Sequence, residues 1–338
     1  MVLYNTYPAF LYRQFLVRPS KAPSSTSLQG TVGLASSQLL GIGLFHLILA
    51  VRNNTKGEAA RSSLLASLPA SAKDPVVEVW ELDLASYTSI IAFAERLKQS
   101  GLRLDFALLN AGVANFNYTV NVSTSHETSI QINWLSTALL TLLLLPILDT
   151  QAAQDPDRAR PVLSIVGSET AAWAKFKGAQ VAQRERISLT QALDDPKHFN
   201  MGDRYYTSKL IQQLFFFELF EHRSSGKRAG GAILNMVKPG FCYGSELHRT
   251  AEGAFGKVLS GMKRVVGRSV SMGARTLVHA VVLAGEASKG CYLCDNKKAS
   301  FAGYGDSEAG RKVQDQVWEE TLLELKQVMN VEELVSQL

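Results

Sequence analysis

The sequence predicts an α/β fold, a doubly wound parallel sheet in a single domain. Five short apolar runs, several of them rich in β-branched residues, alternate with longer stretches in which apolar residues recur at helical spacing. Alternation of this kind is typical of a parallel sheet with helices on both faces. Polar residues and glycines follow directly after these runs, and the carboxyl ends of strands are where such sheets bind ligands.

The composition is that of a globular protein with a sizeable core. Of the 338 residues, 46% are hydrophobic and 19% are charged, a balance that argues against global disorder. The net charge of +5 is spread along the chain without a dense basic run, so nucleic acid is not an expected partner. The three cysteines are too few for a secreted disulfide framework. Cys291 and Cys294 have the spacing of a zinc or redox pair, but no second Cys or His pair accompanies them, so we expect no metal site.

Residues 1–29 are predicted to be an N-terminal extension of a domain that spans residues 30–330. Pro8 and Arg13 interrupt the apolar start, which also lacks the basic segment of a signal peptide. The apolar runs 44–51 and 138–148 are shorter than the ~18 residues of a membrane span. A cytoplasmic protein without membrane association is therefore expected. The alternative of a membrane-associated enzyme rests on the aromatic and apolar segments 10–12 and 15–16.

The first half of the domain predicts three strands separated by helices. Residues 32–40 are compatible with a helix, and the apolar run 45–51 ends in a polar loop, as a buried strand does. Residues 56–68, rich in Ala and Leu, predict a helix. The β-rich run 76–82 predicts a strand, the periodic stretch 87–99 a helix, and the short apolar run 106–109 a third strand.

The second half repeats the alternation around two further strands. Residues 127–145 predict a long helix that ends at Pro146, because proline removes a backbone donor. Strands are predicted at 161–166 and 232–237, with a polar stretch at 169–201 and a helix after Tyr205 between them. Helices at 271–284 and 314–329 and a short strand at 290–293 complete the predicted chain.

Residues suited to ligand binding recur just past these predicted strands. In a parallel sheet the carboxyl ends of neighbouring strands lie at one edge, so the residues that follow them are expected to meet there. These residues are Arg52, Asp83, Asn110, Ala111, Gly112, Ser168, Pro239 and Gly240.

Tyr205 and Lys209 open the helix that follows the polar stretch. Four residues apart, they share one helix face. A phenol titrates near pH ~10 in water, and a neighbouring ammonium favours the phenolate, so the pair is a candidate general acid and base. The spacing by itself is weak, since Tyr-x-x-x-Lys occurs by chance in roughly every second chain of this size. An ordinary amphipathic helix is the alternative.

The order of several short motifs resembles the short-chain dehydrogenase/reductase family, in its fungal and retinol-dehydrogenase-like branches. The resemblance runs from about residue 32 to about residue 244 and implies a Rossmann-like fold. The motifs that carry it are Asp83-Leu84, Asn110-Ala111-Gly112, Asn133, Ser168, Tyr205-x-x-x-Lys209 and Pro239-Gly240.

The resemblance implies a role for each of four residues. Tyr205 exchanges a proton with the substrate oxygen, and Lys209 lowers the pKa of Tyr205 and holds the nicotinamide ribose. Ser168 hydrogen-bonds the substrate oxygen and steadies developing charge. Asn133 supports a proton-relay water. Two alternatives stay open, because Ser168 could cap a turn and Asn133 could be a solvated helix residue.

The same resemblance places a nicotinamide cofactor at the strand ends. It implies that Asn110, Ala111, Gly112, Pro239 and Gly240 contact the cofactor together with Tyr205 and Lys209.

Two further positions concern the adenosine half of the cofactor. Asp83 is implied to contact adenine, or it caps the following helix, and both can hold. Arg52, at the end of the second strand of the family pattern, suits the 2′-phosphate of NADP, so NADP is favoured over NAD.

The family pattern is incomplete at its start. The glycine turn after the first strand is represented by Gly33-Leu34-Ala35, with Ala35 where a glycine is usual. Residues 20–29 are rich in Ser and Pro and make a poor central strand, so the first strand is expected to be missing or incomplete. Gly33 is the candidate for contact with the pyrophosphate.

The resemblance implies an NADP(H)-dependent oxidoreductase that interconverts a carbonyl and an alcohol on a lipophilic small molecule. Fungal relatives suggest secondary-metabolite biosynthesis, and the family forms homo-oligomers. Substrate loops are expected at 170–201 and 241–268, with Phe241, Tyr243, Phe255 and Met262 as candidates to line a pocket. The alternative is a catalytically impaired or non-catalytic homologue that lacks a complete cofactor loop.

Overall fold

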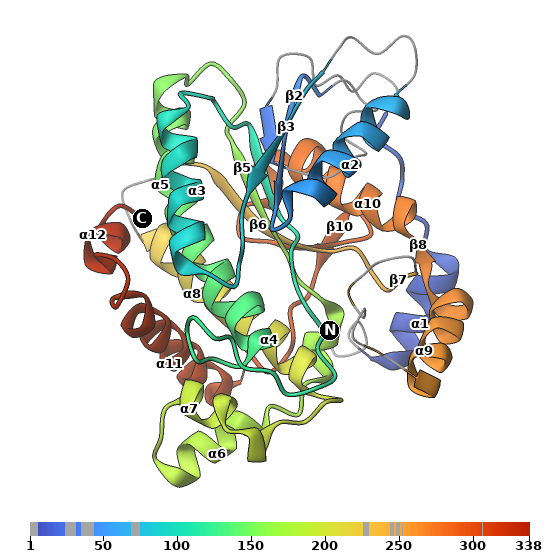
Figure 1. The fold of residues 1–338 in the computed structure, drawn as a ribbon, viewed down its shortest axis with the longest axis vertical. Helices are drawn as coiled ribbons and strands as arrows, with labels where there is room; N and C mark the ends of the chain where they lie inside the picture. The colour runs from blue at the N-terminus through green and yellow to red at the C-terminus, as the bar shows by residue number, and fades with distance from the viewer. Residues whose placement is uncertain are drawn as a thin grey trace.

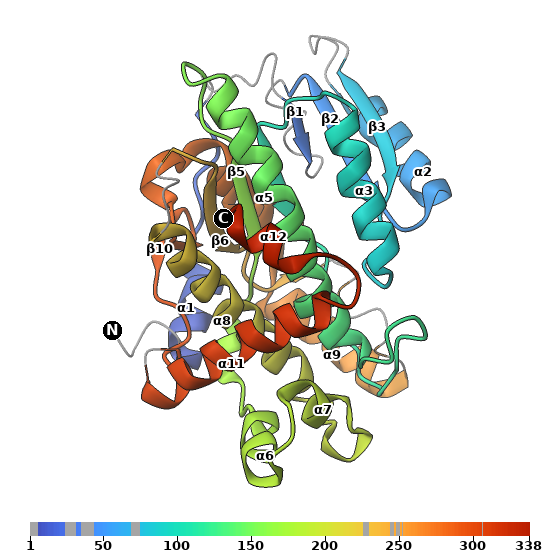
Figure 2. The same ribbon diagram turned by 90° about the vertical axis from the view of Figure 1, so that its left-hand side faces the viewer.

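A computed structural model describes residues 6–23, 32–34, 44–68, 75–225, 230–243, 247, 251, 253–305 and 307–338. Its centre is an eight-stranded sheet with the order β10-β9-β6-β5-β4-β1-β2-β3 (Figures 1 and 2). All neighbouring strands in it are parallel except the edge pair β9 and β10. A two-stranded sheet, β7 with β8, lies apart from it. The strands are β1 Val32–Leu34, β2 His46–Val51, β3 Val76–Glu81, β4 Phe106–Leu109, β5 Val162–Val166, β6 Ile233–Lys238, β7 Cys242–Tyr243, β8 Arg268–Ser269, β9 Tyr292–Cys294 and β10 Lys297–Ala299.

Helices cover both faces of the large sheet, as the sequence predicts. The helices α3, α5 and α8 lie on one face, and α2 and α10 lie on the other (Figure 1). The helices are α1 Tyr7–Leu16, α2 Asn54–Ala66, α3 Tyr87–Gln99, α4 Thr128–Ile130, α5 Thr137–Gln154, α6 Lys177–Glu185, α7 Leu189–Asp194, α8 Arg204–Ser225, α9 Gly253–Val266, α10 Val270–Val278, α11 Glu308–Leu325 and α12 Val331–Ser336.

The strand β4 shows why its short apolar run is fully buried. Its side chains alternate between the two faces, with Phe106 and Leu108 in one core cluster and Ala107 and Leu109 in the other. Since helices cover both faces, every position must be apolar, and no polar alternation appears in the sequence.

The first strand is present, which corrects part of the expectation for this region. Val32, Gly33 and Leu34 form β1 between β2 and β4. The prediction that residues 32–34 belong to a helix is therefore wrong. Parallel pairing on both sides supplies the backbone partners that the local sequence does not suggest. Gly33 lies inside this strand, paired with Leu47 and Phe106, and not in a turn after it. The rest of the predicted glycine turn lies outside the described residues.

Pro146 does not end its helix, contrary to the prediction. It lies inside α5, which continues to Gln154. Proline removes one backbone hydrogen bond, but burial of the leucines of α5 outweighs that loss. Burial of a helix on several sides is a tertiary property that a local breaker signal does not contain.

The C-terminal end of the chain belongs to the same core. Val331, Leu334 and Leu338 pack in the cluster that also holds α5 and α8, so the domain extends past residue 330. Figure 2 shows α11 and α12 crossing the same side as α5 and α8.

Among the residues that the structure describes, one helical stretch has the length and apolar character of a membrane span. It is Thr128–Gln154, with a mean hydropathy of 1.7 in its most apolar window. Since 89% of that window is buried inside the protein, its apolar side chains pack in the core of the domain.

His126 joins three distant segments and sets up a pH-dependent contribution to stability. Its Nδ1 lies 2.7 Å from Asp194 and its Nε2 lies 3.1 Å from Glu324. Burial opposes the charged imidazole, but the two carboxylates outweigh it and raise the pKa of His126 to about 9. Because the folded pKa exceeds the unfolded value, the stabilisation is full below about pH 6.5 and is lost as the pH rises through about 9.

Replacement of His126 by glutamine is therefore expected to lower the free energy of unfolding by roughly 2 kcal/mol at pH 6 and by much less at pH 10. Urea denaturation at the two pH values measures the difference. His222→Gln is the control, because the His222 side chain is 42% exposed in its pair with Glu218. An equal effect of His126→Gln at both pH values would contradict the assignment.

Candidate active site

A cavity of about 710 Å³ lies at the carboxyl ends of β4, β5 and β6. Residues that follow these three strands form one wall, and the start of α8 forms another. The two expected substrate loops contribute Thr170, Trp173 and Met201 from 170–201, and Phe241, Cys242, Leu247, Met262 and Val266 from 241–268. Phe241 and Met262 line the cavity as predicted, whereas Tyr243 is 41% exposed and is not part of its wall. The side chain of Phe255 lies outside the described residues.

Tyr205 and Lys209 lie in the first turns of α8, and both line the cavity. The Lys209 side chain is 3% exposed, and its Nζ donates to the carbonyl oxygen of Val166 at 2.9 Å and to Oε1 of Gln212 at 3.0 Å. Burial lowers the pKa of Lys209 to about 7. Burial also raises the pKa of Tyr205 to about 12, although a hydrogen bond with Ser168 works in the other direction.

The expected lowering of the pKa of Tyr205 by Lys209 is not met in this geometry. Desolvation is the largest influence on both groups, and it pushes the phenol toward its neutral form. The phenol is therefore the protonated species near neutral pH. A protonated phenol beside a cavity is a proton donor, which is the role required for reduction of a carbonyl.

Ser168 follows β5 and faces the cavity while it also caps a turn. Its Oγ accepts from the backbone N–H of Thr170 at 3.3 Å and lies 2.8 Å from the Thr170 hydroxyl. The Ser168 hydroxyl also hydrogen-bonds Tyr205. Ser168 therefore both caps the turn and faces the cavity.

Asn133 is fully buried in the π-helical segment Gln131–Ser136, so it is not a solvated helix residue. Its side chain accepts from the N–H of Val113 at 2.9 Å and donates to the Val113 carbonyl at 2.8 Å. It also donates to Oγ of Ser208 at 2.9 Å. Asn133 therefore connects the segment after β4 to α8.

Glycines at two strand ends let the backbone approach its neighbours closely. A Cβ atom on Gly112 would lie 3.2 Å from Oδ1 of Asn133 and 3.6 Å from Nζ of Lys209. Gly240 has φ +78°, a conformation that side chains other than hydrogen rarely allow, and a Cβ there would lie 3.0 Å from Arg268. With Asn110, Ala111 and Pro239 they form a backbone-rich wall of the cavity.

Three predicted cofactor residues lie outside the cavity wall. Asp83 accepts from the N–H of Ala85 at 2.9 Å, while Ser86 caps α3, so Asp83 stabilises the turn and not the helix itself. Arg52 is exposed just past the end of β2. Gly33 lies inside β1.

The sequence did not point to the N-terminal helix, which is a wall of the cavity. Tyr7 and Phe10 of α1 line it, and their rings contact Trp173 with centroid separations of 5.9 and 5.2 Å. Nothing in the spacing of residues 1–29 indicates this position. The only local signal is that Phe10 and its neighbours are apolar in a segment predicted to be an extension.

Buried charges attach α1 to the residue next to Ser168. Nη2 of Arg13 lies 2.5 Å from Oε2 of Glu169, and the two residues are 5% and 7% exposed. Gln14 donates to the same carboxylate at 3.5 Å, and Nζ of Lys238 lies 3.9 Å from it. Arg268 adds a second tie, because it donates to the Arg13 carbonyl at 2.9 Å.

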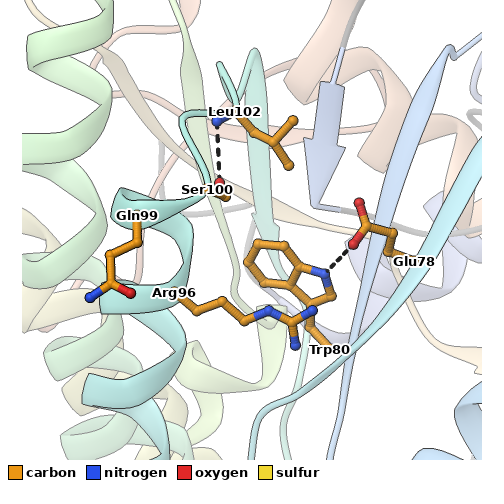
Figure 3. A pocket seen from close by; sticks show the side chains of 6 residues that line it. All are labelled: Glu78, Trp80, Arg96, Gln99, Ser100 and Leu102. Atoms are coloured by element: carbon orange, nitrogen blue, oxygen red, sulfur yellow. Dashed lines mark hydrogen bonds between the residues drawn. The ribbon is translucent and has the colours of Figure 1, made fainter.

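A second hollow, of about 470 Å³, lies beside β3 and α3 and has a different character. Figure 3 shows its six side chains, with the guanidinium of Arg96 over the indole of Trp80 at 4.0 Å and Trp80 donating to Glu78. None of the strand-end residues lines it. In the part of the chain that the structure describes, no group of three or more His, Cys, Asp or Glu side chains is placed to hold a metal ion.

Comparisons with known proteins give the family. No family model matches the chain. Short chain dehydrogenase/reductase mfmJ of Annulohypoxylon moriforme is 36% identical over 328 residues, covering 94% of this chain and 91% of that protein. Short-chain dehydrogenase fogG of Aspergillus ruber is 38% identical over 327 residues, covering 94% of this chain and 88% of that protein.

A solved structure with the same fold is that of RhlG from Pseudomonas aeruginosa in a complex with NADP. Its TM-score is 0.52 and its identity 17%, over 80% of this chain and 97% of that chain. The sequence identities and coverage of the two fungal relatives, together with this fold, identify the chain as an oxidoreductase that belongs to the short-chain dehydrogenase/reductase family.

Proposed function

We propose that the protein is an NADP(H)-dependent oxidoreductase that interconverts a carbonyl and an alcohol on a lipophilic small molecule. The observation that carries this proposal is the convergence of Tyr205, Ser168 and Lys209 on one cavity at the carboxyl ends of β4 and β5. A phenolic proton, a hydroxyl and an amine are placed there around space for a reacting carbonyl.

The chain's own residues would orient the substrate and supply the proton. In the reduction, Tyr205 Oη gives its proton to the carbonyl oxygen while the Ser168 hydroxyl hydrogen-bonds that oxygen. In the oxidation, the same phenolic oxygen takes the proton back. The nicotinamide cofactor, when bound, supplies or accepts the hydride.

The backbone wall of the cavity fits such a cofactor. Asn110, Ala111 and Gly112 on one side and Pro239 and Gly240 on the other would border it, since close backbone approach needs those glycines. The Lys209 amine would hold the ribose, and Asp83 and Arg52 lie toward the sheet edge where the adenosine end would extend. We assign no contact to Gly33, because a residue paired on both sides within a strand is not free to cradle a phosphate.

The character of the cavity favours a lipophilic substrate. Aromatic and apolar side chains from four separate segments line it, and they include Phe10, Trp173, Phe241 and Met262. Burial of an apolar ligand against such a wall is favourable, by about 25 cal/mol per Å² of apolar surface removed from water. Together with the fungal relatives, this supports a role in secondary-metabolite biosynthesis.

Titration of the full chain with NADPH, followed by fluorescence, tests the proposal. Binding followed by turnover of a lipophilic aldehyde or ketone would support it. The second candidate is a catalytically impaired homologue, and it is favoured by the Ser- and Pro-rich sequence of residues 20–29, which is a poor strand sequence ahead of Gly33. Failure to bind NADPH in a folded protein would establish that candidate instead.

Replacement of Arg52 by aspartate tests the preference for NADP over NAD. Aspartate repels the 2′-phosphate and accepts from a ribose hydroxyl, so the ratio of the Kd values for NADPH and NADH is expected to rise by about 10–100-fold. Arg61→Asp on α2 is the control for net charge, since it changes the charge equally on an arginine whose side chain is 43% exposed in its pair with Glu58. A similar shift in both variants would contradict a specific contact of Arg52 with the cofactor.

A further inference from the structure

Gln212 is a buried glutamine one turn after Lys209 on α8, and both ends of its carboxamide are engaged. Its Oε1 accepts from Nζ of Lys209 at 3.0 Å. Its Nε2 donates to the backbone carbonyl of Asn133 at 3.0 Å. Gln212 is 2% exposed, so bulk water does not compete for these two hydrogen bonds.

The two partners allow only one orientation of this carboxamide. An ammonium group has donors and no acceptor, and a carbonyl oxygen has acceptors and no donor. The amide must therefore point its oxygen at Lys209 and its nitrogen at Asn133. A flipped amide would set donor against donor and acceptor against acceptor in a buried site, which costs the desolvation of both pairs.

The bridge also completes the environment of the Lys209 amine. The carbonyl of Val166 takes one of its N–H donors and Gln212 takes a second. The amine lies next to Gly112, where a Cβ atom would be 3.6 Å from Nζ. Without Gln212, the amine would have one acceptor fewer and the Asn133 carbonyl would lose the side-chain donor that Gln212 supplies.

We propose that Gln212 is a positioning residue for the reaction: its carboxamide holds the Lys209 amine at the cavity and stabilises its ammonium form by linking it to the Asn133 carbonyl. The proposal rests on the function proposed above, in which Lys209 takes part. The Asn133 carbonyl accepts from Gln212, and the Asn133 side chain bonds Val113 and Ser208. The support of a relay water by Asn133, which the family resemblance implies, stays a prediction, since a carbonyl oxygen can accept a second hydrogen bond.

Within the described ranges, no charged side chain forms an ion pair that competes with Gln212 for Lys209. The titratable groups that share the cavity are Tyr7, Glu169, Tyr205, Tyr206, Lys238 and Cys242. Among the residues that the structure describes, none of them forms an ion pair with Lys209, and burial is the cause of its lowered pKa. A change in one strong hydrogen-bond acceptor is therefore expected to appear directly in its titration.

The titration of Lys209 in the protein without cofactor tests the proposal. Lysine labelled with ¹³C at Cε gives a chemical shift that follows the charge of each amine, and the Lys209→Arg variant identifies the signal. The midpoint is expected near pH 7 in the wild type, since the pKa of Lys209 is about 7. Gln212→Leu removes an acceptor and is expected to lower the midpoint by about one pH unit, whereas Gln212→Glu adds a carboxylate and raises it by about one unit.

Gln213→Leu is the matched control. Gln213 is also buried, and its amide bonds the Ser168 carbonyl and the Tyr292 hydroxyl but not Lys209. This variant is expected to leave the midpoint of Lys209 unchanged. If Gln212→Leu does not fold, Gln212→Glu decides alone, because an upward shift supports the bridge and an unchanged midpoint overturns it.

The pH dependence of kcat for carbonyl reduction by NADPH gives the second readout. The alkaline limb of this profile is expected to shift to lower pH in Gln212→Leu and to higher pH in Gln212→Glu. A purely structural role of Gln212 would lower kcat without shifting the pH of the limb. If the wild-type protein neither binds NADPH nor reduces a carbonyl, the proposed function is disproved. If the wild type is active but the Lys209 midpoint is unchanged in both Gln212 variants, only the role of Gln212 is disproved.

Discussion

Replacement of Tyr205 by phenylalanine is expected to lower kcat by about 10²–10⁴-fold, because the variant removes the only phenolic proton that is hydrogen-bonded to Ser168 among the described residues. Affinity for NADPH is expected to stay within about threefold of the wild type, since a hydroxyl is lost and no backbone of the cavity wall changes. Steady-state kinetics with a lipophilic ketone and fluorescence titration with NADPH measure the two quantities separately.

Tyr206→Phe is the matched control for this experiment. Tyr206 is the next residue on α8, it also lines the cavity, and its ring packs edge to face against Trp173 at 6.0 Å. A loss of its hydroxyl is expected to change kcat by less than about tenfold, because no contact with Ser168 is involved. Wild-type turnover by Tyr205→Phe, or equal losses in the two variants, would contradict proton transfer by Tyr205.

Replacement of Arg13 by leucine is expected to have the largest effect outside the reacting groups. It breaks a buried ion pair and leaves the Glu169 carboxylate with Gln14 at 3.5 Å and Lys238 at 3.9 Å as its remaining partners. Removal of one member of a buried pair costs about 3–5 kcal/mol, so the free energy of unfolding is expected to fall by about 3 kcal/mol. Denaturation in urea measures this change.

The same variant is expected to weaken substrate binding more than cofactor binding. Arg13 attaches α1 to the site, and α1 supplies Tyr7 and Phe10 to the cavity wall. KM for a lipophilic substrate is expected to rise by about tenfold while the Kd for NADPH changes little, since one or two apolar contacts are worth about 1–3 kcal/mol.

Arg18→Leu provides the comparison, because Arg18 is an exposed arginine just past the end of α1. It is expected to change neither the unfolding free energy nor KM appreciably. If Arg13→Leu left both quantities at their wild-type values, α1 would not be a functional wall of the cavity.

Elements formed by strong local patterns were predictable from the sequence. The predicted helix at 87–99 and strand at 106–109 coincide with α3 and β4, because amphipathic period and short apolar runs are local properties of the chain. The spacing of Tyr205 and Lys209 also needed only the helix that carries both. Since the strands are parallel, the residues that follow them meet at one edge, and this placed Asn110, Ser168 and Pro239 around the same cavity.

Features that depend on partners far along the chain could not be predicted in this way. The strand β1 is held by pairing with β2 and β4 and not by its own propensity, and Pro146 is tolerated because the helix around it is buried. Both corrections have one cause, since tertiary contacts outweigh local preferences of about 1 kcal/mol per residue in strands and about 3 kcal/mol for a helical proline.

The sequence by itself determined the fold class, the family motifs and the candidates for the reacting groups, because each is encoded in residues close together or in a fixed order. Only the tertiary structure decided how those groups are held. Arg13 and Glu169 are 156 positions apart, and Gln212 and Asn133 are 79 apart, so neither pair leaves a pattern in the sequence. A glutamine at helical spacing or an arginine in an N-terminal segment is an ordinary residue until folding buries it against complementary partners.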